Sequence, residues 1–255
     1  MSVTIVDAFI IIFIILGGIV GFKQGAIKTG TRFIGLFVVI IISFILKDKL
    51  MILMYENLPF FNFFGVLKGI EAINILFYQL VSFLIIFAAL MFLLKVLLVV
   101  TGLVEHLLKM TIFLSIPSKI LGLFVGALEY YVYVFIVLFI LSMPIFNLNI
   151  VKDSNLTNNM LENTPILSNI VNDTVNVYSD VWNIIKNEEG KDKTEINTLV
   201  LATLLDNKLI SVESAKTLVS TNKITINDSS ILDNYSDDES LYDKLKEEYY
   251  DKYNN

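Results

Sequence analysis

Four long apolar runs dominate the first 146 residues of this chain. They cover residues 2–22, 26–46, 72–94 and 120–146, and few charges interrupt them. About 20 mostly apolar residues in helical form cross the hydrocarbon core of a bilayer. Each run therefore predicts a membrane-spanning helix, with four spans in all.

Two of the connections between these runs are themselves partly apolar. Residues 47–71 carry four phenylalanines, Phe60, Phe61, Phe63 and Phe64, among a few charges. Aromatic rings sit well at the level of the lipid headgroups. Residues 105–119 form a second stretch of this kind, ending at Pro117. We expect both stretches to lie at the membrane interface, with a plain connecting loop as the alternative.

A polar region with short helical patterns follows residue 146. Val171, Val175, Tyr178, Trp182 and Ile185 recur at helical spacing, and Gly190 follows as a stop signal. Residues 196–204 and 212–219 predict a helical hairpin with Ser211 as the N-cap of its second helix. From residue 227 the sequence is acidic and is expected to be largely disordered, with a helix over 241–253. Such short helices are expected to pack together, on the membrane domain or on a partner.

These patterns predict an all-α, multi-span membrane protein with a helical, partly disordered soluble tail. The expected parts are a membrane domain (1–146), a module of short amphipathic helices (147–226) and an acidic C-terminus (227–255). Composition agrees, because 55% hydrophobic residues, a mean hydropathy of +0.71 and 17% charged residues are too apolar for a soluble protein.

Charge is distributed unevenly between the two halves of the chain. Residues 1–143 hold nine lysines and arginines against six acids, and the remainder holds ten against nineteen. The acidic tail lacks the basic, aromatic pattern of a nucleic-acid-binding surface. The first apolar run lacks the basic start and cleavage site of a signal peptide, so we expect it to remain as an anchor.

Basic residues in the short connections predict the orientation in the membrane. The first connection carries Lys23, Lys28 and Arg32 without an acid, and the third carries three lysines against Glu105. These connections are expected on the cytoplasmic side, which places the N-terminus and the tail outside the cytoplasm. The second connection is not depleted in lysine.

Glycines recur four residues apart in two of the apolar runs. Gly17, Gly21 and Gly25 do so in the first, and Gly122 and Gly126 in the fourth. Between membrane helices, small residues at this spacing allow close backbone approach. We predict that spans one and four pack here, or that a homo-oligomer forms through these faces. Glycine is also common in membrane helices generally, and Gly25 could instead serve a turn beyond the helix end.

Three ionisable residues lie within the apolar runs, where charge is expensive and is a candidate for function. Asp7 lies about one turn into the first run, and Lys95, at the end of the third, can extend its long side chain to water. Glu129 lies near the middle of the fourth run and could pair with Lys95 or take up a proton. Alternatively, the tyrosines that follow it form an interfacial belt, residues 130–151 span the membrane, and Glu129 lies at the surface.

Two glycine-containing blocks resemble the colicin V production protein (CvpA) family over residues 3–146. The first block comprises an early Asp7, Gly21-Phe22-Lys23 with Gly25, then Ile27-Lys28 and Gly35. The second is Leu121-Gly122-Leu123-Phe124-Val125-Gly126, which follows the basic Lys119. Three positions depart from the family pattern: Thr29 and Ser118 replace acidic residues, and Glu129 replaces a basic one.

The resemblance implies a bacterial inner-membrane protein tied to colicin V production and to envelope homeostasis, without enzymatic activity or cofactor. We expect a membrane scaffold or accessory factor whose tail binds an envelope protein. The alternative is an oligomeric channel or transporter with a polar path near Glu129 and Lys95. A toxin-immunity or lysis protein has no positive support in the sequence.

The sequence offers little for catalysis or metal binding. Residues 233–239 fail as a calcium loop, since Asp238 stands where glycine is needed. His106, the chain's one histidine, lacks companion ligands, and cysteine is absent altogether. We therefore expect no enzyme, no metal and no cofactor.

Overall fold

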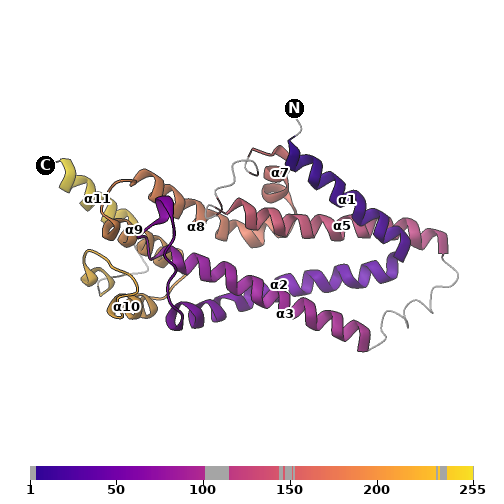
Figure 1. Cartoon of the computed structure of the whole chain (residues 1–255), viewed down its shortest axis with the longest axis horizontal. Helices are drawn as coiled ribbons and strands as arrows, with labels where there is room; N and C mark the ends of the chain where they lie inside the picture. The colour runs from indigo at the N-terminus through magenta and orange to yellow at the C-terminus, as the bar shows by residue number, and fades with distance from the viewer. Residues whose placement is uncertain are drawn as a thin grey trace. The chain divides into compact units, whose positions relative to one another are not determined.

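The computed structural model describes residues 4–100, 115–143, 146, 151, 153–233, 235 and 240–254, and the regular elements within them are helical (Figure 1). The four long helices of the membrane half are α1 (Ile5–Gln24), α2 (Ala26–Asn57), α3 (Ile73–Val100) and α5 (Ser115–Ser142). The tail holds α7 (Asn155–Asn163), α8 (Leu167–Asn187), α9 (Lys193–Asp206), α10 (Val212–Ser220) and α11 (Leu241–Asn254). The described residues also form two 3₁₀ turns, η1 (Gly65–Leu67) and η3 (Ser229–Leu232). The all-α prediction is confirmed.

Three of the long helices are long and apolar enough to cross a membrane: Ile5–Gln24, Ile73–Val99 and Pro117–Ser142. They coincide with three of the four predicted spans and identify the chain as a membrane protein. The fourth, predicted over residues 26–46, lies within α2, which is not among these three helices. A membrane crossing by α2 stays a prediction.

The helices form two compact units that each combine distant parts of the sequence. The first unit joins Met1–Leu46 to Phe83–Asn172, and the second joins Lys47–Ser82 to Asp173–Asn255. The helices α2, α3 and α8 each contribute residues to both units.

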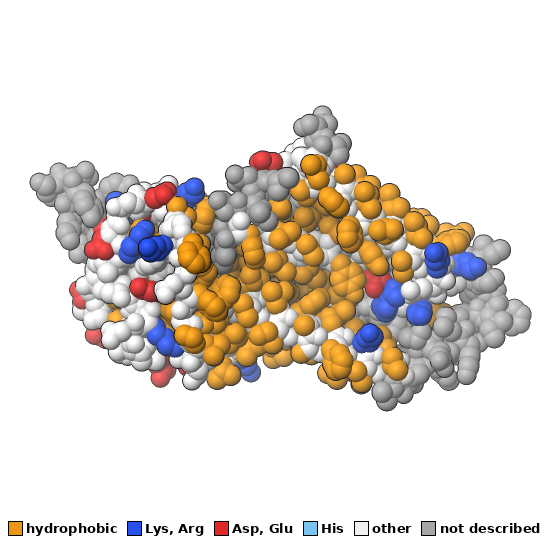
Figure 2. All heavy atoms as spheres, viewed as in Figure 1, with side chains coloured by type: hydrophobic (Ala, Val, Ile, Leu, Met, Phe, Trp, Pro, Cys, Tyr) orange, Lys and Arg blue, Asp and Glu red, His pale blue; other side chains and the backbone are white. Residues whose placement is uncertain are grey.

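The first unit is built around α1, which lies along α5 (Figure 1). Aromatic rings fill its core: the Phe44 ring lies 4.8 Å from Phe83 and 6.2 Å from Phe139 between centroids. The outward faces of α1 and α5 are also apolar, as the orange side chains in Figure 2 show, and Phe9 and Phe124 are among the exposed residues. A surface of this kind suits lipid rather than water.

The second unit is centred on α9, whose residues from Glu195 to Leu205 are all buried. The sequence predicted a one-sided apolar stripe here, but Leu201 and Ala202, on the opposite face, are buried as well. A helix that is apolar around most of its circumference belongs in the interior of a fold. The predicted N-cap of α10 is confirmed, because the Ser214 N–H donates to Ser211 Oγ at 3.1 Å. Packing of α9 and α10 against each other as a hairpin stays a prediction.

The tail is attached to the second connection by side chains that bind its backbone. Asn197 accepts the Ala72 N–H at 3.1 Å and donates to Glu71 Oε2 at 2.6 Å. Lys223 donates to the carbonyls of Tyr55 at 2.9 Å and of Leu58 at 3.1 Å, which closes the C-terminal end of α2. We therefore expect the tail and the second connection on the same side of the membrane.

Aromatic contacts hold the second connection against the start of α3. The Phe61 ring meets Phe77 edge-on at 4.8 Å, and the Asn74 side chain binds both the N–H and the carbonyl of Phe61. Phe64, by contrast, is 92% exposed. Whether this stretch lies at the membrane interface stays a prediction, and most of the second such stretch, residues 105–119, lies outside the described residues.

The other helices predicted in the tail also form. Helix α8 covers the predicted apolar stripe, and Gly190 follows it with a positive φ of 99°. Helix α11 covers the helix predicted over 241–253, and Asp206 caps it by accepting the N–H groups of Leu241 and Tyr242 at 3.1 and 3.0 Å.

Candidate functional site

The closest approach of two helices in the first unit is built from glycines. A side-chain carbon added at Gly21 would lie 2.0 Å from the Gly122 carbonyl oxygen, and one at Gly122 would lie 2.4 Å from the Gly21 carbonyl oxygen. One at Gly126 would lie 2.3 Å from the Gly17 carbonyl oxygen. The structure therefore brings four of the five predicted glycines together, with the backbones of α1 and α5 in direct contact.

The fifth glycine, Gly25, has a different position. It lies beyond the end of α1 with a φ of 81°, and its N–H donates to the Gly21 carbonyl at 2.8 Å. L-residues with a side chain rarely adopt this left-handed backbone. Gly25 thus ends α1 and turns the chain into α2, as the alternative interpretation of the sequence had it.

Ser118 supports the same turn from α5. Its Oγ accepts the N–H of Ala26, the first residue of α2, at 3.2 Å. The first turn of a helix has N–H groups without a helical partner, so this contact caps α2 from another helix. Three helices consequently meet at this turn.

A buried ion pair joins α2 to α5 near the glycine contact. The Arg32 Nη2 lies 2.8 Å from Glu129 Oε2, and the Glu129 side chain is only 4% exposed. Arg32, 28% exposed, also donates to the side chain of Gln24. The structure thus places Glu129 inside the helix bundle.

This arrangement corrects the partner that the sequence suggested for Glu129. Lys95 was the expected cation, but its side chain is exposed, and Arg32 makes the pair instead. Arg32 is the chain's one arginine, and arginine is the usual choice for a buried ion pair because its charge is delocalised and weakly hydrated. That feature could have pointed to Arg32.

Asp7 is likewise buried and bound. Ser154 donates to its Oδ1 from Oγ at 2.6 Å, and the N–H of Leu156 does so at 3.3 Å. Its second carboxylate oxygen accepts the Thr4 N–H at 2.8 Å, which completes the N-cap of α1. Asp7 therefore ties the start of α1 to the start of α7, a partner that the sequence gave no means to find.

The remaining candidates stand apart from these contacts. Lys23 is exposed and Lys28 half-buried, on either side of the turn at Gly25, and their role in setting orientation stays a prediction. His106 lies outside the described residues. Among the residues that the structure describes, no cluster of three or more histidines, cysteines or acids could hold a metal ion.

The arrangement can hold helices in fixed positions. Backbone contact joins α1 to α5, the Arg32–Glu129 pair joins α2 to α5, and Asp7 joins α1 to α7. The two glycine faces meet within one chain, so a homo-oligomer would have to form elsewhere or by exchanging these helices between copies.

Comparison with known families gives one match. The family described as colicin V production protein matches residues 6–165, which include Asp7, both glycine blocks, Arg32, Glu129 and Ser154. No curated protein and no solved structure matches this chain. The resemblance seen in the sequence is confirmed.

Proposed function

We propose that this chain, which belongs to the colicin V production protein family, acts in colicin V production as a non-enzymatic membrane scaffold. The family supports the role in production and is not a known family of enzymes. The scaffold mechanism, and a wider part in envelope homeostasis, are the proposal. In it, the first unit is a fixed helix bundle and the tail presents a surface to an envelope protein.

The observation that carries the scaffold proposal is the state of the ionisable groups in the apolar helices. Asp7 and Glu129 are buried, and both have partners within the same bundle. A carboxylate with a fixed cation or several fixed donors stabilises one arrangement of helices. Moving the helices apart would leave the carboxylate charge unpaired in an apolar medium. These contacts favour a rigid bundle over a path for ions.

The tail supports the second half of the proposal. It packs on the second connection through Asn197 and Lys223, so it is a folded module rather than a loose extension. We place this module outside the cytoplasm of a bacterial inner-membrane protein, following the basic residues of the first and third connections. An envelope protein is the partner expected there, and nucleic acid is not.

A charge exchange tests the scaffold in cells. In a strain that secretes colicin V and depends on this chain, we expect Arg32→Glu or Glu129→Arg alone to reduce the inhibition zone on a sensitive lawn. The double exchange should recover most of the zone, because it restores an ion pair between α2 and α5. Equal amounts of each variant in the membrane fraction, measured by immunoblot, provide the control.

The alternative function is an oligomeric channel or transporter that uses the polar residues near Glu129. The burial of a carboxylate within a candidate membrane span favours it. A path of this kind needs the carboxylate at position 129. The double exchange of Arg32 and Glu129 would then fail to restore the inhibition zone, and Glu129→Gln would abolish solute or ion flux in liposomes. No flux from the folded wild type above that of empty liposomes would exclude the alternative.

A further inference from the structure

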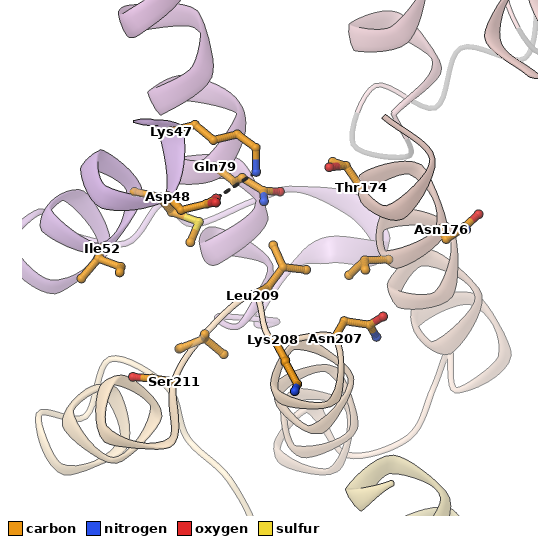
Figure 3. Close-up of a pocket in the computed structure, with 13 residues that line it drawn as sticks. Lys47, Asp48, Ile52, Gln79, Thr174, Asn176, Asn207, Lys208, Leu209 and Ser211 are labelled. Carbon is orange, nitrogen blue, oxygen red and sulfur yellow. Dashed lines mark hydrogen bonds and ion pairs between the residues drawn. The ribbon is translucent and has the colours of Figure 1, made fainter. Parts of the chain in front are cut away.

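The second unit contains a cavity of 520 Å³ that the scaffold proposal does not use. Its walls come from the end of α2, the start of α3, α8 and the turn between α9 and α10 (Figure 3). One part of the lining is apolar, with Met51, Ile52 and Val177, and another carries charged and amide side chains. Polar and charged residues outnumber apolar ones in the lining, so the cavity suits a polar ligand better than an apolar one.

Three polar side chains converge in this cavity. Figure 3 shows the ends of Lys47, Asp48 and Gln79 close to one another, with Lys47 Nζ 2.8 Å from Asp48 Oδ1. The Lys47 side chain is only 10% exposed, whereas Asp48 is largely open to solvent. A lysine buried to this degree is usually paired, and Asp48 supplies that partner while Lys47 stays at the cavity wall.

Gln79 provides a second and independent observation. The residue is 3% exposed, and its Oε1 accepts no hydrogen bond from any residue that the structure describes. Buried polar atoms in proteins almost always have a partner. A group that brings an O–H or N–H donor to this wall would supply one.

The charge of the lining indicates the sign of the ligand. Lys47 and Lys208 contribute two positive charges and Asp48 one negative charge, which leaves a net charge of +1. Lys47 directly follows the uncharged residues 33–46, and Gln79 lies in the first third of α3, one of the candidate spans. The polar wall is thus formed where apolar helices give way to charged residues, as they do at the headgroup level of a bilayer.

We propose that this cavity binds a phosphate ester that carries a free hydroxyl group, the chemistry of the headgroup of phosphatidylglycerol. Lys47 attracts the phosphate, Lys208 adds positive charge to another part of the lining, and the hydroxyl donates to Gln79 Oε1. The single negative charge of such an ester matches the lining, whereas phosphatidylcholine carries no net charge and no donor. A soluble glycerol phosphate also offers a phosphate and free hydroxyl groups, but as a monoester it carries a charge of about −1.5 to −2 at pH 7.

The test measures binding to the full-length protein purified in a neutral detergent. The probes are short-chain phosphatidylglycerol, phosphatidylcholine of the same chain length, and sn-glycerol 3-phosphate. The variants are Lys47→Gln and Gln79→Met, and Lys49→Gln is the matched control because Lys49 is exposed and does not line the cavity. We expect phosphatidylglycerol to bind roughly tenfold more weakly to the two cavity variants and unchanged to the control.

Each outcome decides the proposal. Binding of the lipid alone assigns the site to a headgroup, and binding of sn-glycerol 3-phosphate with the same dependence on the variants assigns it to a soluble ester. Equal binding of both lipids, an equal loss in Lys47→Gln and Lys49→Gln, or no binding of either phosphate ester overturns it. Where Lys47→Gln does not fold, Lys208→Asn replaces it, since asparagine tolerates the positive φ of 56° at that position.

Discussion

The Ser154 hydroxyl donates a hydrogen bond of 2.6 Å to the Asp7 carboxylate, and both residues are buried. Ser154 is also the N-cap of α7, where its Oγ accepts the Thr157 N–H at 3.0 Å. The start of α1 and the start of α7 are thereby held together. Since the described residues between Ser142 and the tail include no candidate span, we expect the start of α1 and the tail on the same side of the membrane.

The hydrogen bond between Ser154 and Asp7 implies that α2 crosses the membrane if α1 does, and this implication can be tested. The tail also binds the second connection through Asn197 and Glu71, so we expect these two parts on one side of the membrane as well. From the start of α1 to that connection the chain must cross the membrane an even number of times. If α1 crosses, α2 must cross as well, although α2 is not among the three helices that satisfy the length and composition criteria.

The first prediction therefore concerns topology, and the cysteine-free chain suits it. We expect an impermeant thiol reagent to label Asn62→Cys and Ser220→Cys in intact cells, and Gln24→Cys only after permeabilisation. Asn62 and Ser220 are exposed in the second connection and in α10, and Gln24 ends α1. Labelling of Gln24→Cys together with Asn62→Cys would show that α2 does not cross. The fully reversed pattern would keep four spans and place the tail in the cytoplasm.

The second prediction concerns the glycine contact. We expect Gly122→Ala to lower the free energy of unfolding by about 1–3 kcal/mol, because its new methyl group would meet the Gly21 carbonyl oxygen at 2.4 Å. Gly30→Ala is the matched control, since nothing lies within 4 Å of the added carbon. That change should raise stability by about 0.5–1 kcal/mol through the helix preference of alanine. Thermal unfolding in detergent compares the two, and equal melting temperatures would contradict the packing role.

The third prediction measures the Arg32–Glu129 pair by a double-mutant cycle. Glu129→Gln leaves the Arg32 guanidinium without its carboxylate, so we expect the single changes to cost more than the double change with Arg32→Gln. The coupling should be about 0.5–3 kcal/mol. The exposed pair Lys216–Asp233, 2.6 Å apart, is the control and should show a smaller coupling. A coupling no larger than that of the control would remove the pair from the scaffold argument.

The helices themselves were readable from the sequence because their signals are local. Apolar runs of about 20 residues, Ser211 before an apolar stripe, and Gly190 after one each predicted an element that the structure contains. The partners of Glu129 and Asp7 were not readable, because they depend on which helices become neighbours and at what depth. Lys95 and Arg32 carry the same charge. The preference of buried ion pairs for arginine favours Arg32, and the placement of α2 beside α5 then selects it.

The attachment of the tail to the second connection could not be predicted from the sequence for a similar reason. Asn197 looks like an ordinary polar residue in a short helix, yet its amide binds residues more than a hundred positions earlier. The burial of α9 on all sides follows from this attachment. An amphipathic pattern indicates one apolar neighbour, whereas α9 has the second connection as a further one.

The fourth prediction uses the pH dependence of the second unit. The Thr194 N–H donates to the Asp192 carboxylate at the start of α9, and this hydrogen bond holds the pKa of Asp192 below its ordinary value of 3.8. A lowered folded-state pKa contributes stability above the unfolded pKa and loses it as pH falls through the folded value. We expect the second unit to lose stability below about pH 4, with a smaller loss in Asp192→Asn, which keeps the cap without the charge.

Trp182, the chain's one tryptophan, lies in the part of α8 that belongs to the second unit, so its fluorescence reports this unit selectively. Melting curves of the full chain between pH 3 and pH 7 then compare wild type with Asp192→Asn. At Asp228, the Ser230 hydroxyl and the Ser230 N–H both donate to the carboxylate, and these hydrogen bonds lower the pKa of Asp228. Adding Asp228→Asn to Asp192→Asn should reduce the loss of stability at low pH further. Identical pH profiles for wild type, Asp192→Asn and the double variant would contradict the role of these hydrogen bonds in the pH dependence.

The fifth prediction places the second connection at the membrane interface. Phe61 packs on Phe77, but Phe64 is 92% exposed next to Gly65, which has a φ of 65°. An exposed phenylalanine in the connection that leads to a candidate span gains free energy by entering the headgroup region. In a Trp182→Phe background, we expect Phe64→Trp to be quenched by lipids brominated near the headgroup, and the exposed tail variant Ser220→Trp to be unaffected. If both tryptophans escape quenching, the connection stands clear of the bilayer and its aromatic residues serve only to anchor α3 to the second unit.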